Sequence, residues 1–149
     1  MRTTVIVIAV LMFSSVVAFA RKEESLQDLI ARAEAARPQD RPELYTEIAE
    51  RQLASADQLY TAGKVEDAGE AIKDVVKYAD KARDAAVETG KQLKHTEIAM
   101  RRMAAKLRDI KRGLAFEDQP PVQASIEHLE NLRTELLARM FGNKEKKEQ

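Results

Sequence analysis

The sequence predicts an all-α protein: an antiparallel helical hairpin or coiled-coil bundle around one long central helix at about residues 65–112. Three observations lead to this class. Charged residues make up 34% of the 149-residue chain and aromatic residues 5%, a composition typical of long helices. Apolar residues recur at alternating spacings of three and four, which places them on one helix face. No proline interrupts the chain between Pro42 and Pro120.

The central helix is predicted from a single apolar seam. Only Thr89 and Thr96 interrupt this seam, and its phase is unchanged across Gly90. Two separate helices have no reason to keep register across a loop, so one continuous helix about 70 Å long is favoured. The alternative is a break at Gly90, because glycine costs roughly 1 kcal/mol inside a helix. The seam comprises Val65, Ala68, Ile72, Val75, Ala79, Ala82, Ala86, Leu93, Met100, Met103, Leu107, Ile110 and Leu114.

Shorter helices are predicted on both sides of the seam. An amphipathic helix at 24–37 ends at Pro38, and a second at 40–62 ends at Gly63. The last helix follows the loop around Pro120 and Pro121 and ends at Gly142. Short connections imply antiparallel neighbours. The predicted helical domain spans residues 21–142, and residues 143–149 form a charged flexible tail.

The first 20 residues have the pattern of a signal peptide. Arg2 precedes an uncharged run that closes with Ala18, Phe19 and Ala20, the small-x-small pattern read by signal peptidase, and charge resumes at Arg21. Cleavage before Arg21 predicts an exported protein, periplasmic or extracellular. The alternative is an uncleaved N-terminal membrane anchor, because the apolar run is near the lower length for spanning a bilayer.

The residue content argues against an enzyme. The chain has no cysteine, which excludes disulfides, thiol catalysis and cysteine metal sites. His95 and His128 lie on different helices and lack a second histidine or an acidic residue three or four positions on, as a helical metal site needs. Phosphate-binding loops and nucleophile elbows are not recognisable. We therefore expect no catalytic residue, no cofactor and no metal.

Charge is concentrated on one predicted helix segment. Residues 91–114 contain 8 basic and 2 acidic residues, a net charge of +6, whereas residues 21–90 carry 11 basic and 16 acidic residues, a net charge of −5. No aromatic side chain interleaves with the basic segment, so nucleic-acid binding is not expected. Acidic residues on the last helix, Glu127, Glu130 and Glu135, are expected to neutralise most of it. The candidate interaction face consists of Lys94, Arg101, Arg102, Arg108 and Arg112.

The hairpin around Gly63 resembles one unit of the tetratricopeptide-like helical repeats. The resemblance covers about residues 42–75. One period downstream the corresponding positions, Leu93 and Lys94, lead into a segment without a glycine turn, and a repeat array needs about three units. The resemblance implies a protein-interaction role for the hairpin. The residues that match the repeat are Leu59, Tyr60, Gly63, Ala68, Ala71 and Ile72.

These features together predict an exported, non-enzymatic interaction or scaffold protein of the periplasm or cell envelope. Its protein partner is unknown, and unpaired parts of the Ala68–Ala86 seam would favour a homodimer. One alternative is a peripheral binder of anionic membrane or cell-wall polymer through the basic face at 91–112, which is not favoured. Another alternative is a periplasmic helical chaperone.

Overall fold

The computed structural model describes residues 23–145, and this range consists of helices joined by short turns. The prediction of an all-α bundle is confirmed, and no strand occurs between residues 23 and 145. The signal-peptide residues Ala18, Ala20 and Arg21 lie outside the described part of the chain. No helix in that part is both long enough and apolar enough to cross a bilayer. The elements are α1 (Leu26–Ala35), the 3₁₀ turn Pro38–Asp40, α2 (Arg41–Thr61), α3 (Val65–Thr89), α4 (Leu93–Arg112), the 3₁₀ turn Phe116–Asp118 and α5 (Gln119–Glu145).

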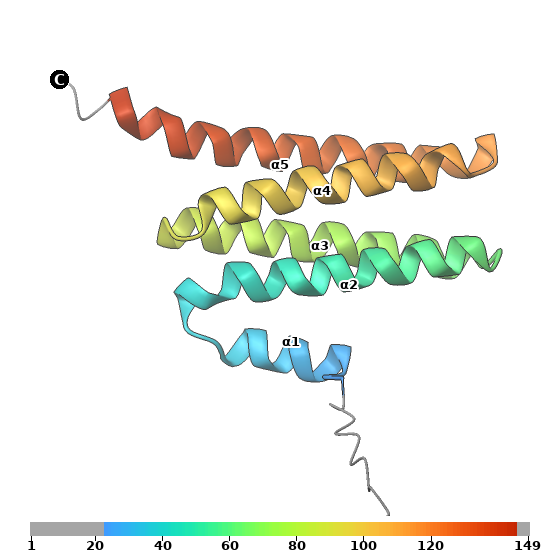
Figure 1. Cartoon of the computed structure of the whole chain (residues 1–149), viewed down its shortest axis with the longest axis horizontal. Helices are drawn as coiled ribbons and strands as arrows, with labels where there is room; N and C mark the ends of the chain where they lie inside the picture. Colours follow the sequence, from blue (N-terminus) through green and yellow to red (C-terminus); the bar gives the residue numbers. More distant parts are fainter. Residues whose placement is uncertain (1–22, 146–149) are drawn as a thin grey trace, which may run out of the picture.

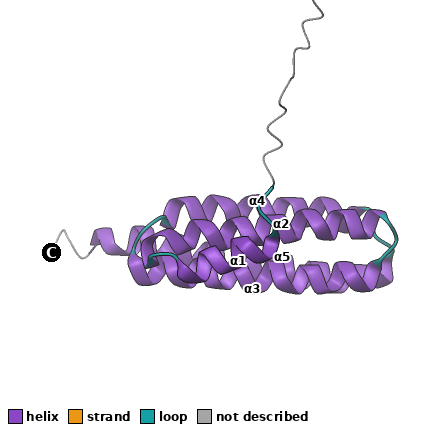
Figure 2. Cartoon of the chain, turned by 90° about the horizontal axis from the view of Figure 1, so that it is seen from below, coloured by secondary structure: helices purple, strands orange, loops and turns teal. Residues whose placement is uncertain are grey.

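The four long helices run alternately in opposite directions along one axis (Figure 1). The α2/α3 and α4/α5 pairs are antiparallel hairpins that pack face to face, so that α2 lies beside α4 and α3 beside α5. Side-chain pairs between α2 and α4 follow a parallel register, because residues 50 and 57 of α2 meet residues 102 and 106 of α4. The short α1 packs on the outside of the α2/α3 hairpin (Figure 2).

The prediction of one continuous helix at 65–112 is wrong, because the chain reverses after Thr89. Gly90 has φ +65° and Gln92 has φ +58°, so two left-handed residues turn α3 into an antiparallel α4. Gly90 adopts this conformation without the steric cost that a Cβ would add. The reversal lets both halves of the apolar seam bury against one core, whereas a straight helix would leave much of the seam in water.

The end of α5 also differs from the prediction. The helix continues through Gly142 to Glu145. Gly142 is not among the glycines with positive φ, and a glycine in right-handed conformation weakens a helix without ending it. The described helical domain therefore extends beyond the predicted boundary at residue 142.

The core differs in composition between the two hairpins. Alanines dominate the α2/α3 interface, where small side chains let two helix backbones approach closely. Larger side chains fill the α4/α5 half, and each fully buried leucine there contributes about 1.5–3 kcal/mol. The alanine seam is buried within one chain, so it is not available for the self-association that the sequence predicted. Fully buried residues include Ala49, Ala56, Ala68, Ala79, Ala82 and Ala86 in the first hairpin, and Met100, Leu107, Leu129 and Leu136 in the second.

Helix α1 begins with a side-chain cap and buries one apolar face. The Ser25 hydroxyl accepts a hydrogen bond from the backbone N–H of Asp28 at 3.1 Å and donates one to the Asp28 carboxylate at 2.7 Å. Such a cap satisfies a backbone donor that the first helical turn leaves unpaired. Leu29 and Ala33 on the opposite face are completely buried.

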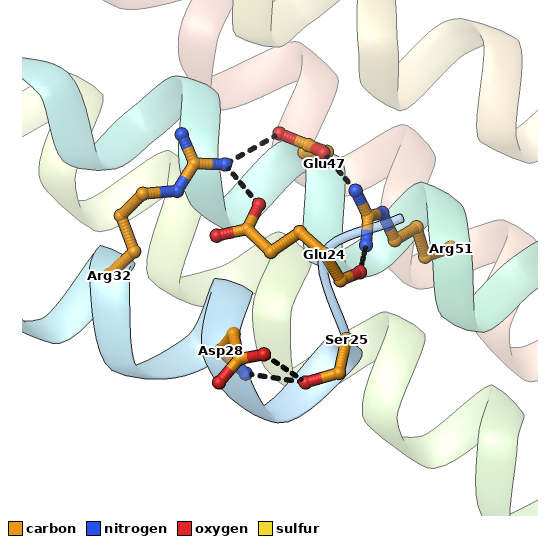
Figure 3. Close-up of polar contacts among 6 residues, drawn as sticks. All are labelled: Glu24, Ser25, Asp28, Arg32, Glu47 and Arg51. Atoms are coloured by element: carbon orange, nitrogen blue, oxygen red, sulfur yellow. Dashed lines mark hydrogen bonds and ion pairs between the residues drawn. The ribbon is translucent and has the colours of Figure 1, made fainter. Parts of the chain in front are cut away.

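Four charged residues tie the start of α1 to α2 (Figure 3). Arg32 contacts the carboxylate of Glu24 at 2.7 Å and that of Glu47 at 3.6 Å. Arg51 pairs with Glu47 at 2.7 Å and donates a second hydrogen bond to the backbone carbonyl of Glu24 at 2.7 Å. Because Arg51 spans 27 residues of sequence to reach Glu24, this contact fixes the position of α1 on α2.

The other end of α1 is fixed to α3 by Lys81. Its Nζ lies 2.7 Å from the Glu34 carboxylate and stands over the rings of Tyr45 and Tyr78, at 5.1 and 5.6 Å from their centroids. The hydrogen bond from Lys81 lowers the pKa of Glu34 and, reciprocally, raises the pKa of Lys81. The pair therefore prefers the ionised state of both groups in the folded protein.

The left-handed turn can be tested with two glycine-to-alanine substitutions of opposite expected sign. Gly90→Ala forces a Cβ into positive φ, so we expect a loss of about 1–2 kcal/mol in unfolding free energy. Gly69→Ala is the matched control, because Gly69 lies inside α3 where an added Cβ meets nothing within 4 Å. Here we expect a gain of about 0.5–1 kcal/mol. Urea unfolding followed by circular dichroism measures both, and equal effects would contradict the turn.

The pH dependence of stability should report the Glu34–Lys81 pair. The folded-state pKa of Glu34 lies below its unfolded value, so its stabilisation is lost as the pH falls through the folded pKa. The folded-state pKa of Lys81 is raised, so that contribution is lost only when the pH rises through it. We expect Glu34→Gln to lower the free energy of unfolding at pH 7. The variant should also lose less of this free energy than the wild type does when the pH falls from 7 to 3.

The control for this measurement is Glu70→Gln. Glu70 pairs with Lys73 within α3, so its loss separates no helices, and both side chains are more than 70% exposed. We expect this variant to follow the wild-type pH profile in urea titrations. An unchanged profile for Glu34→Gln would refute the assignment of this acid dependence to α1 docking.

Candidate functional site

The predicted hairpin residues form a helix-ending turn between α2 and α3. Gly63 has φ +73°, and its backbone N–H donates to the Tyr60 carbonyl at 3.0 Å. The N–H of Lys64 donates to the Leu59 carbonyl at 2.9 Å. This pair of bonds is a Schellman motif, which satisfies carbonyls that the last helical turn leaves open. Beyond the turn, Ala68 and Ile72 are buried in the core.

The α2–α3 turn lies beside the α4–α5 turn at one end of the bundle (Figure 1). Burial raises the pKa of Tyr60, and the negative charge of Asp118 adds to this shift, so these two residues from different turns are close. A surface cavity of about 240 Å³ lies between the ends of α2 and α4 and is lined by Tyr60, Gly113 and Leu114 among others. Two charged side chains of the cavity lining already pair with each other, because Lys106 lies 2.6 Å from Asp57.

Most of the predicted basic face on α4 is paired with acidic residues. Arg102 pairs with Glu50 of α2, Arg108 lies 2.6 Å from Glu130 of α5, and Arg112 pairs with Asp109 one turn away. The ion pairs to α2 could not be found from the sequence, because they depend on α4 packing parallel to α2. Of the three acidic residues of α5 that were expected to neutralise this face, only Glu130 contacts it. Glu135 pairs with Arg83 of α3 instead. Glu127 accepts a hydrogen bond from the Gln123 side chain.

Two residues of the predicted face remain available. Lys94 and Arg101 are exposed and have no ion-pair partner within residues 23–145. The structure thus divides the predicted face into three paired arginines and two unpaired cations. Two isolated charges on a helix surface attract an anionic polymer far less than the predicted five would.

One ion pair lies largely inside the α4/α5 interface. Arg133 Nε donates to Glu97 at 2.6 Å, and the Glu97 side chain is only 9% exposed. The hydrogen bond from Arg133 to Glu97 raises the pKa of the guanidinium, which stays charged. A buried carboxylate requires such a partner, since an unpaired buried charge is costly. The pair therefore holds the two helices in register.

The two histidines do not meet in a shared site. His128 Nε2 lies 2.8 Å from the Asp80 carboxylate of α3, and His95 is exposed near the start of α4. Across residues 23–145, no group of three or more histidine or acidic side chains is arranged to hold a metal ion. His128 and Asp80 instead extend the polar contacts between α5 and α3, next to the Arg83–Glu135 pair.

Phe116, which the sequence did not single out, is the most exposed large apolar side chain among the described residues. It belongs to the 3₁₀ turn between α4 and α5 and is 87% exposed. A surface cavity of about 280 Å³ beside it is lined by Lys111, Gln119, Pro120 and Gln123. The sequence could have indicated this residue, because it is the one aromatic residue of a proline-containing loop. No helical periodicity accounts for an apolar side chain at that position.

Four carboxylates surround this end of the bundle. They come from the first turn of α3 and from the turn that precedes α5, and none has an ion-pair partner in the described range: Glu66, Asp67, Glu117 and Asp118. Val65, which is 37% exposed, adds a second apolar side chain. We call Val65, Glu66, Asp67, Phe116, Glu117 and Asp118 the loop end of the bundle.

Comparison with known protein-family models, with curated protein sequences and with solved structures finds no match to this chain. The resemblance of residues 42–75 to a tetratricopeptide-like unit therefore stays a prediction. We therefore infer a function from the exposed side chains of the molecule.

Proposed function

We propose that this protein is an exported, non-enzymatic interaction or scaffold module of the periplasm or cell envelope, and that it contacts a protein partner through the loop end. The observation that carries the proposal is Phe116, which is 87% exposed in a turn at the end of the bundle. An aromatic side chain surrounded by polar residues is a common centre of a binding surface.

The α4–α5 turn that presents Phe116 is held by hydrogen bonds on both sides. The N–H of Gly113 donates to the Ile110 carbonyl at 3.0 Å, and the N–H of Asp118 donates to the Ala115 carbonyl at 3.0 Å. The Gln119 side chain donates to the Leu114 carbonyl at 3.1 Å. A side chain held on an ordered turn loses less conformational entropy on binding than one on a flexible loop.

The body of the bundle is suited to a structural support. Ion pairs link α1 to α2 and α3, α2 to α4, α3 to α5, and α4 to α5. Charged side chains used in this way specify how helices pack and are not available for chemistry. This distribution favours a scaffold over an enzyme.

The alternative functions receive less support. A binder of anionic lipid or cell-wall polymer would use the basic face of α4, in which Arg102, Arg108 and Arg112 are paired with carboxylates. A chaperone needs a broad apolar surface for unfolded clients. Within the described residues the large exposed apolar side chains are Val65, Phe116 and Phe141, which lie on separate elements.

Export can be tested on the mature protein. We expect N-terminal sequencing or intact mass spectrometry of protein from the envelope fraction to give Arg21 as the first residue, because signal peptidase reads small residues at positions 18 and 20. Ala20→Arg should block cleavage and retain the precursor, whereas Arg21→Lys, the control, should leave processing intact. A wild-type chain that keeps residues 1–20 would support the membrane-anchored alternative.

Partner contact through the loop end can be tested by photo-crosslinking in the producing cell. A photoreactive phenylalanine analogue at position 116 should form protein adducts because this side chain is exposed at the proposed interface. The matched control places the same analogue at Ala54, an exposed position in the middle of α2, away from both ends of the bundle. Equal adduct yields at the two positions would argue against a binding role for Phe116.

The free energy of unfolding should show whether Phe116 serves binding or folding. Because Phe116 is exposed, we expect Phe116→Ser to change the unfolding free energy by less than about 0.5 kcal/mol. Leu129→Ala, at a fully buried position of α5, should cost about 2–5 kcal/mol. Urea unfolding measures both.

A further inference from the structure

We propose that the loop end docks on the opposite end of a second copy of this chain, so that bundles associate head to tail. The inference rests on the proposed function, because it names the partner of the same surface. It depends on a charge and apolar complementarity between the two ends of one molecule.

The loop end carries excess negative charge. Its four carboxylates, two from each turn, have no ion-pair partner in the described range. Nearby cations are largely used elsewhere, since Arg112 pairs with Asp109 and Lys111 donates to Gln123 at 2.7 Å. Lys64 is the cation of this region that stays unpaired within residues 23–145. Unpaired carboxylates around an exposed phenylalanine fit a surface that is basic and partly apolar.

The other end of the bundle has the reverse charge. We define the basic end as Lys91, Leu93, Lys94, Arg139 and Met140, which come from the α3–α4 turn, the start of α4 and the end of α5. Its three cations are exposed and lack ion-pair partners in the described part of the chain. Two exposed carboxylates without ion-pair partners in the described range, Glu43 in the first turn of α2 and Glu88 at the end of α3, leave this end with a smaller positive excess. Arg37 and Asp40 of the α1–α2 connection pair with each other at 2.8 Å.

Local helix stability does not explain why lysines lie at the start of α4. The N-terminus of a helix carries a partial positive charge, so a cation there destabilises the helix. The first turn of α4 contains no acidic residue, and its N-cap, Gln92, makes no side-chain cap. By contrast, the carboxylates in the first turn of α3 are stabilised by the partial positive charge at that helix N-terminus. The placement of Lys91 and Lys94 therefore requires another reason, and contact with a carboxylate-bearing partner supplies one.

The backbone of the basic end is also held in an uncommon conformation. Gln92 adopts φ +58°, a left-handed conformation that is unfavourable for a residue with a Cβ. Its side chain donates to the Gln39 carbonyl at 3.1 Å, which ties the α3–α4 turn to the α1–α2 connection. The lysines on either side of Gln92 are thus presented from an ordered turn.

Apolar surface is available at both ends. Phe116 is 87% exposed at the loop end, and Leu93 and Met140 are half-buried at the basic end. The last turns of α5 extend beyond the α3–α4 turn (Figure 1). In a head-to-tail contact Leu93 and Met140 provide the apolar side chains beside which Phe116 of the next copy can lie.

The symmetry and size of the contact predict its behaviour. Two different surfaces meet, so the interface is heterologous and every assembly keeps one free loop end and one free basic end. Helices about 10 Å in diameter give a four-helix cross-section of roughly 400 Å² per partner, below the size of a stable interface. The association is therefore weak, grows with concentration and is screened by salt.

Charge reversal at each end provides the test. Sedimentation velocity of the full mature chain at low salt should give an average mass that rises with concentration and returns to the monomer value at about 0.5 M salt. Glu117→Lys with Asp118→Lys, and separately Lys91→Glu with Lys94→Glu, should each remain monomeric. An equimolar mixture of the two variants should associate like the wild type, because the native pair of ends and the charge-swapped pair of ends are both complementary. A chain that carries all four substitutions should associate like the wild type.

Two further variants separate charge from apolar contact. Glu127→Lys on the outer face of α5 is the matched control and should leave association unchanged. Phe116→Ser keeps every charge and should reduce the associated fraction at low salt. A wild-type chain that stays monomeric at all concentrations, or a mixture that does not associate, overturns the inference.

Crosslinking at position 116 distinguishes this inference from the proposed function. An adduct of two copies of the chain supports head-to-tail contact. An adduct with a different protein, together with a monomeric chain in sedimentation, overturns the self-association and leaves the interaction function standing. Failure of position 116 to crosslink above the Ala54 control overturns both.

Discussion

The bundle depends on the reversal of the chain between Thr89 and Leu93. Two consecutive hairpins face each other only because Gly90 and Gln92 adopt left-handed conformations there. The glycine makes this conformation accessible, and Gln92 is held by its hydrogen bond to Gln39. Burial of both halves of one apolar seam in a shared core offsets the local cost. Every contact between α2 and α4, or between α3 and α5, follows from this reversal.

The same reversal determines where the charges lie. It places α4 parallel to α2, and basic side chains of α4 then meet Glu50 and Asp57. A helix segment with a net charge of +6 in the sequence thus becomes a largely neutral surface along the side of the bundle. Most of the unpaired charges named above lie at the two ends, where no neighbouring helix covers them, and Arg101 on the side of α4 is an exception. For this reason we place recognition at the ends of the molecule and not along its sides.

Much of the secondary structure could be predicted, but part of the candidate site could not. The ends of α2 near Gly63 and of α4 near Gly113 follow from residue types that act locally. The break at Gly90 was the alternative that the sequence did not favour, because antiparallel helices facing one core can preserve an apolar phase across a turn. Phe116 was missed because only its exposure marks it as a candidate site residue. That exposure depends on whether another helix covers the α4–α5 turn, which the sequence does not show.

The sequence by itself determined the helical class and the helix pairs α2/α3 and α4/α5. These properties depend on composition and on spacing within a few residues, where local physics decides. Only the tertiary structure decided which charges are neutralised, that the alanine seam is internal, and which side chains lie at the two ends. Those outcomes depend on contacts between residues about 50 positions apart, such as Glu50 with Arg102 and Asp80 with His128, and on the direction in which the chain turns at Gly90.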